Sequence, residues 1–281
     1  MATRYRLKGS TDFLASAYWG GVSPASNDDL RIGEGADGFD TNTSQPSIDL
    51  KSIWFDKRFG DPSTRIGITG GPLTFDVNQT GTGVFKFQGR CAELGYAFGA
   101  GGACATMEWS PQNDTAKLLA GGTGTFTELL LQRGQSTIGS GAAITTGVIE
   151  GGYHVIAAHA SNTPALTVSG GLLVLRRDWS SLKVCGTGQV IVELDAGVTG
   201  GTIEIAGDPN ACGVMIRQGD TGAITGISGV LDETELQRAA TVANATFYSR
   251  LTRLRRNGAA EIAFTSGPTN KGLGPVVRVV G

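Results

Sequence analysis

Acidic residues that could cleave a glycosidic bond lie in the second half of the chain. Glu193 and Asp195 are two residues apart in a segment with strand-like alternation, which places both side chains on one face. Glu204 and Asp208 would follow on the next turn of chain. Glycoside hydrolysis needs two carboxylates about 5–10 Å apart beside a cleft. Stacked carboxylates also keep an outward face soluble, and we predict this second role, with no catalytic residue and no enzymatic activity.

Metal-binding and nucleophilic residues are few. The two histidines, His154 and His159, are five residues apart, so in a strand they would point to opposite faces and share no metal. We therefore expect them at the surface or in turns. The four cysteines are Cys91, Cys104, Cys185 and Cys212. Their spacing lacks the CxxC pairs of a zinc site, and buried free thiols are predicted instead. The sequence predicts no metal site and no cofactor.

Glycine is abundant, at 44 of 281 residues, and its spacing suggests the fold. Short alternating apolar segments end in glycines at positions 134, 152, 170, 186 and 207. This period of about 18 residues is too short for helical repeats of ~33–47 residues, and the segments are rich in the β-formers Val, Ile and Thr. They predict an all-β parallel β-helix with coils of about 16–21 residues, because stacked coils bury apolar faces that no single coil can bury. A β-sandwich or barrel is the alternative.

The pattern divides the chain into three parts. Residues 1–64 are predicted to form an N-terminal arm and capping strands, residues 65–231 the β-helix, and residues 232–281 terminal β coils and a tail. Apolar residues within 233–256 also recur with helical spacing, so a helix is the alternative there. Residues 172–175, Leu-Leu-Val-Leu, are expected to expose an apolar face that packing about a threefold axis would bury.

Charge and hydropathy exclude several partners. The 23 Lys and Arg against 25 Asp and Glu give a net charge of −2, whereas a nucleic-acid-binding protein usually has a basic excess. No apolar run approaches the ~18 residues of a membrane span. The N-terminal residues lead into no long apolar segment, so no secretory signal is expected and synthesis into the cytoplasm is the default. We predict no nucleic-acid partner and no membrane association.

The layout of several segments resembles a known family. These segments are Trp19-Gly20-Gly21, Asn27-Asp28-Asp29, Ser52-Ile53-Trp54-Phe55 and Arg65-Ile66-Gly67, followed by the glycine-closed strands. They resemble the β-helical head decoration, or cement, proteins of tailed bacteriophages. The resemblance implies a structural virion protein that binds the major capsid protein as a homotrimer. It also implies a location on the capsid surface, and in the host cytoplasm during assembly.

Two sets of residues are candidates for contacts with partners. The arm lacks a periodic core pattern and is basic and aromatic, which suits an extended peptide that becomes ordered on a capsid. Its candidate residues are Arg4, Tyr5, Arg6, Lys8, Tyr18 and Trp19. Trp109 and Trp179 lie among polar residues and are predicted at an interface, with packing on a coil edge as the alternative.

Two further functions are compatible with a β-helix. A receptor-binding fibre or tailspike, with or without glycan cleavage, would use the same frame. So would a carbohydrate-active enzyme or adhesin outside a virus, although the absence of a visible signal peptide argues against that hypothesis.

Overall fold

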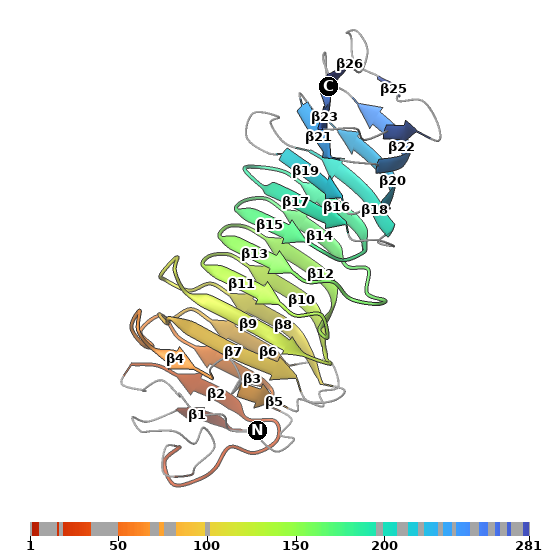
Figure 1. Ribbon diagram of the computed structural model, residues 1–281. Coiled ribbons are helices and arrows are strands. Elements are labelled where there is room, and N and C mark those ends of the chain that lie inside the picture. The colour runs from red at the N-terminus through yellow and green to blue at the C-terminus, as the bar shows by residue number, and fades with distance from the viewer. Residues whose placement is uncertain are drawn as a thin grey trace. The chain divides into compact units, whose positions relative to one another are not determined.

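A computed structural model describes residues 2–5, 16, 19–34, 50–67, 73–75, 83–98, 102–194, 199–206, 213–218, 222–229, 233–237, 240–247, 253–257, 262–264, 269–270 and 278–280. The regular elements of these residues are β-strands, and neighbouring strands pair in parallel (Figure 1). The predicted parallel β-helix is therefore confirmed. The described residues contain no helix with the length and apolar character needed to cross a membrane.

The chain divides into two compact units. Unit 1 contains residues 1–146 and 152–154, and unit 2 contains residues 147–151 and 155–281. The division falls within two strands, β12 (Ala143–Ile149) and β13 (Tyr153–Ile156). The predicted boundaries after residues 64 and 231 stay predictions.

Unit 1 contains two parallel ladders. The first ladder, here called ladder A, runs in the order β1 (Thr3–Tyr5), β2 (Asp29–Ile32), β3 (Ser52–Phe55), β6 (Val84–Phe87), β8 (Ala103–Trp109) and β10 (Thr125–Leu131). The second, ladder B, runs β4 (Arg65–Ile66), β7 (Glu93–Phe98), β9 (Lys117–Gly122) and β11 (Gln135–Ile138), and β5 (Leu73–Phe75) also pairs with β7.

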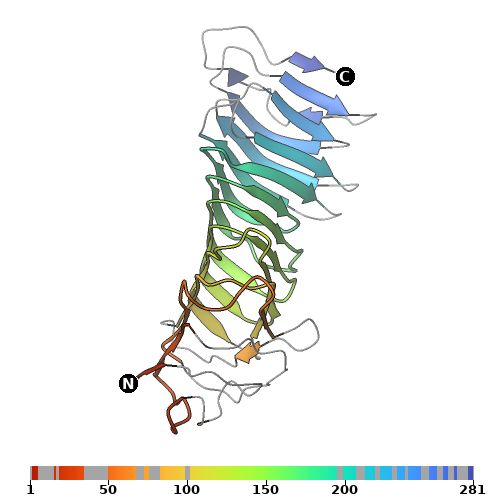
Figure 2. The same ribbon diagram turned by 90° about the vertical axis from the view of Figure 1, so that its left-hand side faces the viewer.

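Unit 2 repeats the same arrangement. Ladder A contains β14 (Ala165–Val168), β16 (Trp179–Val184), β18 (Thr199–Ile205), β20 (Gly222–Gly229), β22 (Ala240–Phe247) and β24 (Ile262–Phe264), with β25 (Thr269–Asn270) beside β22. Ladder B contains β15 (Leu172–Leu175), β17 (Gln189–Leu194), β19 (Gly213–Gln218), β21 (Glu233–Gln237), β23 (Arg253–Asn257) and β26 (Arg278–Val280). Figure 2 shows the strands of each ladder lying side by side.

The register of the ladders builds the core. Leu166 pairs with Leu182, which pairs with Ile203, and all three are buried. Strand alternation places every second side chain inside, so matched apolar residues stack from coil to coil. The coil from Leu166 to Leu182 is 16 residues long, whereas the coil from Glu93 to Lys117 is 24 residues long. The predicted range of 16–21 residues is therefore too narrow, because turn length varies between coils.

The C-terminal segment forms strands. β21, β22 and β23 occupy most of residues 233–256, where helical spacing of apolar residues allowed a helix. β22 pairs in parallel with β20 over seven registered residue pairs. The β-prone residues of this segment therefore extend the ladders.

The backbone geometry of the turns explains why the apolar segments end in glycine. Gly134, Gly152 and Gly186 have φ angles of 70°, 88° and 57°, a region that residues with a Cβ rarely adopt. A Cβ on Gly152 would also collide with the carbonyl oxygen of Gly134, one coil below. The periodic glycine in the sequence thus marks the point where a turn passes directly over the turn before it.

We expect Gly152→Ala to lower the free energy of unfolding by at least about 2 kcal/mol, because it combines left-handed backbone with a steric collision. The matched control is Gly121→Ala in β9, where a Cβ would meet nothing within 4 Å. That control should change stability by less than about 1 kcal/mol. Urea denaturation of both variants measures the difference, and equal midpoints would contradict this account of the turn.

Candidate functional site

Two of the four acidic residues considered for catalysis are paired with cations. Glu193 accepts a hydrogen bond from Arg176 Nε at 2.6 Å, and Glu204 lies 3.3 Å from Lys183 Nζ. Asp195 and Asp208 lie outside the described residues. Glu193 and Glu204 are thus both engaged with cations, and the described residues contain no group of three or more His, Cys, Asp or Glu side chains that could hold a metal ion.

The prediction of a surface or turn position is wrong for His154. This side chain is fully buried, and its Nδ1 lies 2.9 Å from the Oγ of Ser136, which is also buried. Ser136 in β11 and His154 in β13 occupy inward positions, and these two strands are neighbours in the same sheet as β9 and β15. A buried hydroxyl beside an imidazole satisfies hydrogen bonds within the core, whereas a nucleophile must contact its substrate. The pair is therefore structural.

His159 lies in the turn after β13 and is half-buried. Its Nδ1 accepts a hydrogen bond from the backbone N–H of Ser161 at 3.2 Å. Partial burial and the positive charge of Arg177 lower the pKa of His159. This residue belongs to the turn, as the sequence predicted.

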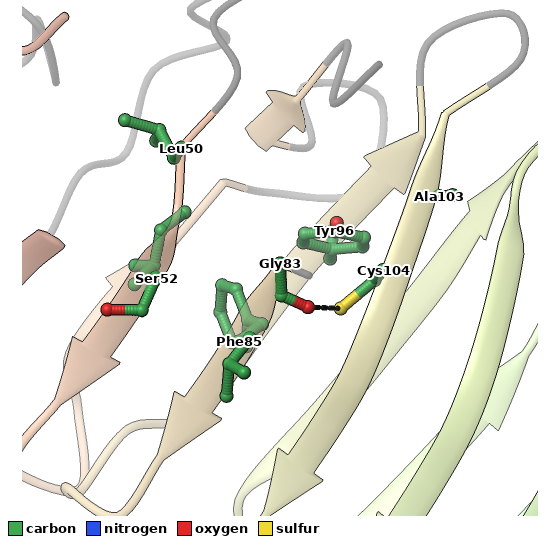
Figure 3. A pocket seen from close by; sticks show the side chains of 9 residues that line it. Leu50, Ser52, Gly83, Phe85, Tyr96, Ala103 and Cys104 are labelled. Carbon is green, nitrogen blue, oxygen red and sulfur yellow. Dashed lines mark hydrogen bonds between the residues drawn. The ribbon is translucent and has the colours of Figure 1, made fainter. Parts of the chain in front are cut away.

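Two of the cysteines are confirmed as buried free thiols. Burial raises the pKa of both Cys91 and Cys104 to about 12, so neither forms a reactive thiolate near neutral pH. Cys185 is free and half-buried, and Cys212 lies outside the described residues. The Cys104 thiol is directed toward the Gly83 carbonyl oxygen, 3.5 Å away (Figure 3).

The cavity beside Cys104 is too small for a ligand. Its volume is about 20 Å³, and Phe85 and Tyr96 lie along its wall (Figure 3). Such a volume holds about one water molecule, whereas small-molecule sites usually span roughly 300–1,000 Å³. Deep burial raises the pKa of the Tyr96 hydroxyl, with a smaller contribution from Cys104. This cavity is a packing feature of the core.

The predicted interface role of Trp109 and Trp179 is wrong, because both indoles are buried within the chain. Trp109 stacks on Phe87 with ring centres 4.9 Å apart. Trp179 donates from Nε1 to the Thr202 carbonyl at 3.3 Å, and a Cβ on Gly200 would strike its ring. The indoles point inward although their sequence neighbours are polar.

The N-terminal candidates fall into three groups. Tyr5 is 69% exposed and is available to a partner. Trp19 is only 4% exposed, so its predicted contact with a capsid is wrong: it packs inside unit 1. Arg4 lies in β1, and Arg6, Lys8 and Tyr18 lie outside the described residues.

The first residues also belong to the ladder rather than to a free arm. Thr3–Tyr5 pairs in parallel with β2. Buried Asp28 accepts hydrogen bonds from the backbone N–H groups of Ala2 and Ala25, each at 3.0 Å. This carboxylate ties the first strand to the turn before β2.

An outward row of side chains begins at Tyr5; the sequence analysis named Tyr5 but missed the other members of the row. Tyr5 is in register with Arg31, Arg31 with Trp54, and Trp54 with Lys86. The Arg31 guanidinium lies 4.2 Å from the Trp54 ring centre and Lys86 Nζ lies 5.7 Å from it. We call these four residues the outer row. Cation–π contacts of this kind hold the indole between two cations.

Lys86, the last residue of the outer row, forms an ion pair. Lys86 Nζ lies 2.7 Å from Glu108 Oε2 in the next strand. The Nε1 of Trp54 is buried and has no hydrogen-bond partner among the described residues. Tyr, Trp and Arg are the residue types most enriched in interaction hot spots. The outer row therefore has the chemistry of a protein-binding surface.

Comparisons with protein families, curated proteins and solved structures find no match to this chain.

A buried arginine fixes the turn between β13 and β14. Arg177 is 1% exposed and donates from Nε to the Ala157 carbonyl at 2.7 Å and from Nη1 to Asn162 Oδ1 at 3.0 Å. Burial lowers the pKa of Arg177 to about 10, so the guanidinium remains charged at neutral pH. The Arg177 side chain thus forms hydrogen bonds with two residues of the turn.

We expect Arg177→Ala to destabilise the protein by about 2–4 kcal/mol, because it leaves buried acceptors without a charged donor. Its neighbour supplies the matched control. The Arg176 side chain is 48% exposed and pairs only at the surface with Glu193, so Arg176→Ala should cost less than about 1 kcal/mol. Chemical denaturation compares the two, and a loss at Arg177 no greater than at Arg176 would refute the anchoring role.

Proposed function

We propose that this chain is a structural virion protein that decorates and stabilises the outside of a bacteriophage capsid and binds the major capsid protein. The observation that carries the proposal is the outer row of unit 1. It presents exposed Tyr5 in register with Arg31, followed by Trp54 and Lys86 on the next two strands of ladder A. The family resemblance supports the same location for the contact, near the N-terminus.

Three features of the described residues fit a structural role better than a catalytic one. The candidate carboxylates Glu193 and Glu204 pair with cations. The histidine and serine that lie close together are buried. The two buried thiols have raised pKa values. A reconstruction of intact particles tests the proposal: density on the head surface supports it, whereas density at the tail would support the receptor-binding fibre or tailspike.

The proposed homotrimer rests on the family resemblance. The expected apolar face at residues 172–175 does not support it, because Leu173, Val174 and Leu175 are buried within the chain and only Leu172 is half-buried. We expect native mass spectrometry at micromolar concentration to show three chains. A monodisperse monomer would contradict this part of the proposal.

Two aromatic variants separate attachment from folding. We expect Tyr5→Ala to weaken binding to heads that lack this protein by about 10-fold, with the melting temperature nearly unchanged, because Tyr5 is exposed. Trp19→Ala should instead lower the free energy of unfolding by about 3–5 kcal/mol, because Trp19 is buried.

Cosedimentation with heads and thermal melts of both variants give the measurement. If Tyr5→Ala bound as tightly as the unchanged chain, the outer row would not be the attachment surface.

A further inference from the structure

A basic groove crosses four successive turns of unit 1. It has a volume of about 430 Å³ and is lined by Lys57, Gln88, Arg90, Ser110, Pro111, Gln112 and Arg133. Lys57 follows β3, Arg90 follows β6, Gln112 follows β8 and Arg133 follows β10, so the lining side chains come from neighbouring strands of ladder A. The volume lies within the usual range for a ligand site.

Hydrogen bonds hold the centre of the groove in place. Gln112 donates from Nε2 to the Lys57 carbonyl at 2.9 Å and accepts from Arg90 Nε at 3.3 Å. These contacts join turns that are 55 and 22 residues apart in sequence. The Arg90 guanidinium is therefore oriented before any ligand arrives, which reduces the entropy lost on binding.

Two more lining side chains, Gln88 and Arg133, contact acidic residues outside the groove. Gln88 donates from Nε2 to Glu108 Oε1 at 3.1 Å, and Arg133 Nε lies 3.6 Å from Asp114 Oδ1. Neither acid lines the groove, and Glu108 also pairs with Lys86. The seven lining residues thus include three cations and no carboxylate.

We propose that this groove binds an acidic polysaccharide through its carboxylate groups. Guanidinium groups bind carboxylates with two parallel hydrogen bonds, and the amides of Gln88 and Gln112 and the hydroxyl of Ser110 suit sugar hydroxyls. Each step along the ladder is about 4.8 Å, so Lys57, Arg90 and Arg133 are spread along the groove. A chain with repeated carboxylates can reach all three cations, whereas one small anion cannot.

A single-stranded nucleic acid fits the groove less well. Binding of unpaired bases relies on exposed aromatic side chains, and the seven lining residues include none. The proposal is independent of capsid attachment, because the groove residues are distinct from the outer row.

Calorimetry with a galacturonate hexamer tests the proposal, with cellohexaose as the neutral control and a thymidine oligonucleotide as the nucleic-acid control. We expect the galacturonate hexamer to bind most tightly. Arg90→Gln and Arg133→Gln should each weaken this binding by about 10-fold, because each removes a charge-assisted contact.

The matched control is Arg58→Gln. The Arg58 side chain is 74% exposed, lies next to Lys57 in sequence, does not line the groove, and pairs with Glu34 at 3.6 Å. This variant removes the same charge and should bind galacturonate as the unchanged chain does.

Four outcomes would overturn the proposal: no binding of galacturonate, equal binding of cellohexaose, tighter binding of the oligonucleotide through Arg90 and Arg133, or an equal loss in Arg58→Gln. Thermal melts verify that the variants fold. Head binding by Arg90→Gln and Arg133→Gln should be unchanged, so failure of this proposal and failure of capsid attachment are distinguishable.

Discussion

In-register stacking of coils at the ladder spacing of about 4.8 Å is the constraint on which the rest of the structure depends. It places each inward side chain directly against its counterpart, as for Leu166, Leu182 and Ile203. It also places each turn against the carbonyl oxygens of the turn before. A Cβ on Gly152 or Gly170 would strike the carbonyl of Gly134 or Glu150, respectively. The periodic glycines are therefore a consequence of stacking.

The same constraint determines the chemistry of the outward face. Residues in register lie about 5 Å apart, so like charges in neighbouring strands repel and opposite charges pair. Lys86 is in register with Glu108 and Lys183 with Glu204, and both pairs form ion contacts. Stacked carboxylates on a β-helix are thus weak signals of catalysis.

The fold could be predicted from the sequence because the glycine spacing and strand alternation both arise from stacking. It was harder to predict which side chains of each strand point into the core. Trp109 follows outward Glu108 and is itself buried, so polar neighbours in sequence misled the prediction of an interface. His154 lies in Tyr-His-Val-Ile, where Val155 and Ile156 are both apolar and do not show which face is inward. The groove could not be predicted, since its residues span positions 57 to 133 and meet only when four turns stack.

Strand positions and turns differ in the kind of binding surface that they can form. Inward positions are committed to packing, and even polar ones such as Ser136 and His154 satisfy each other inside. Outward strand positions are flat and regular, which suits the outer row for contact with another protein surface. Turns vary in length from coil to coil and can form concave walls, as at Gln112 and Arg133. Because turn length changes without disturbing the ladder, a β-helix can acquire a ligand groove while its core register stays fixed.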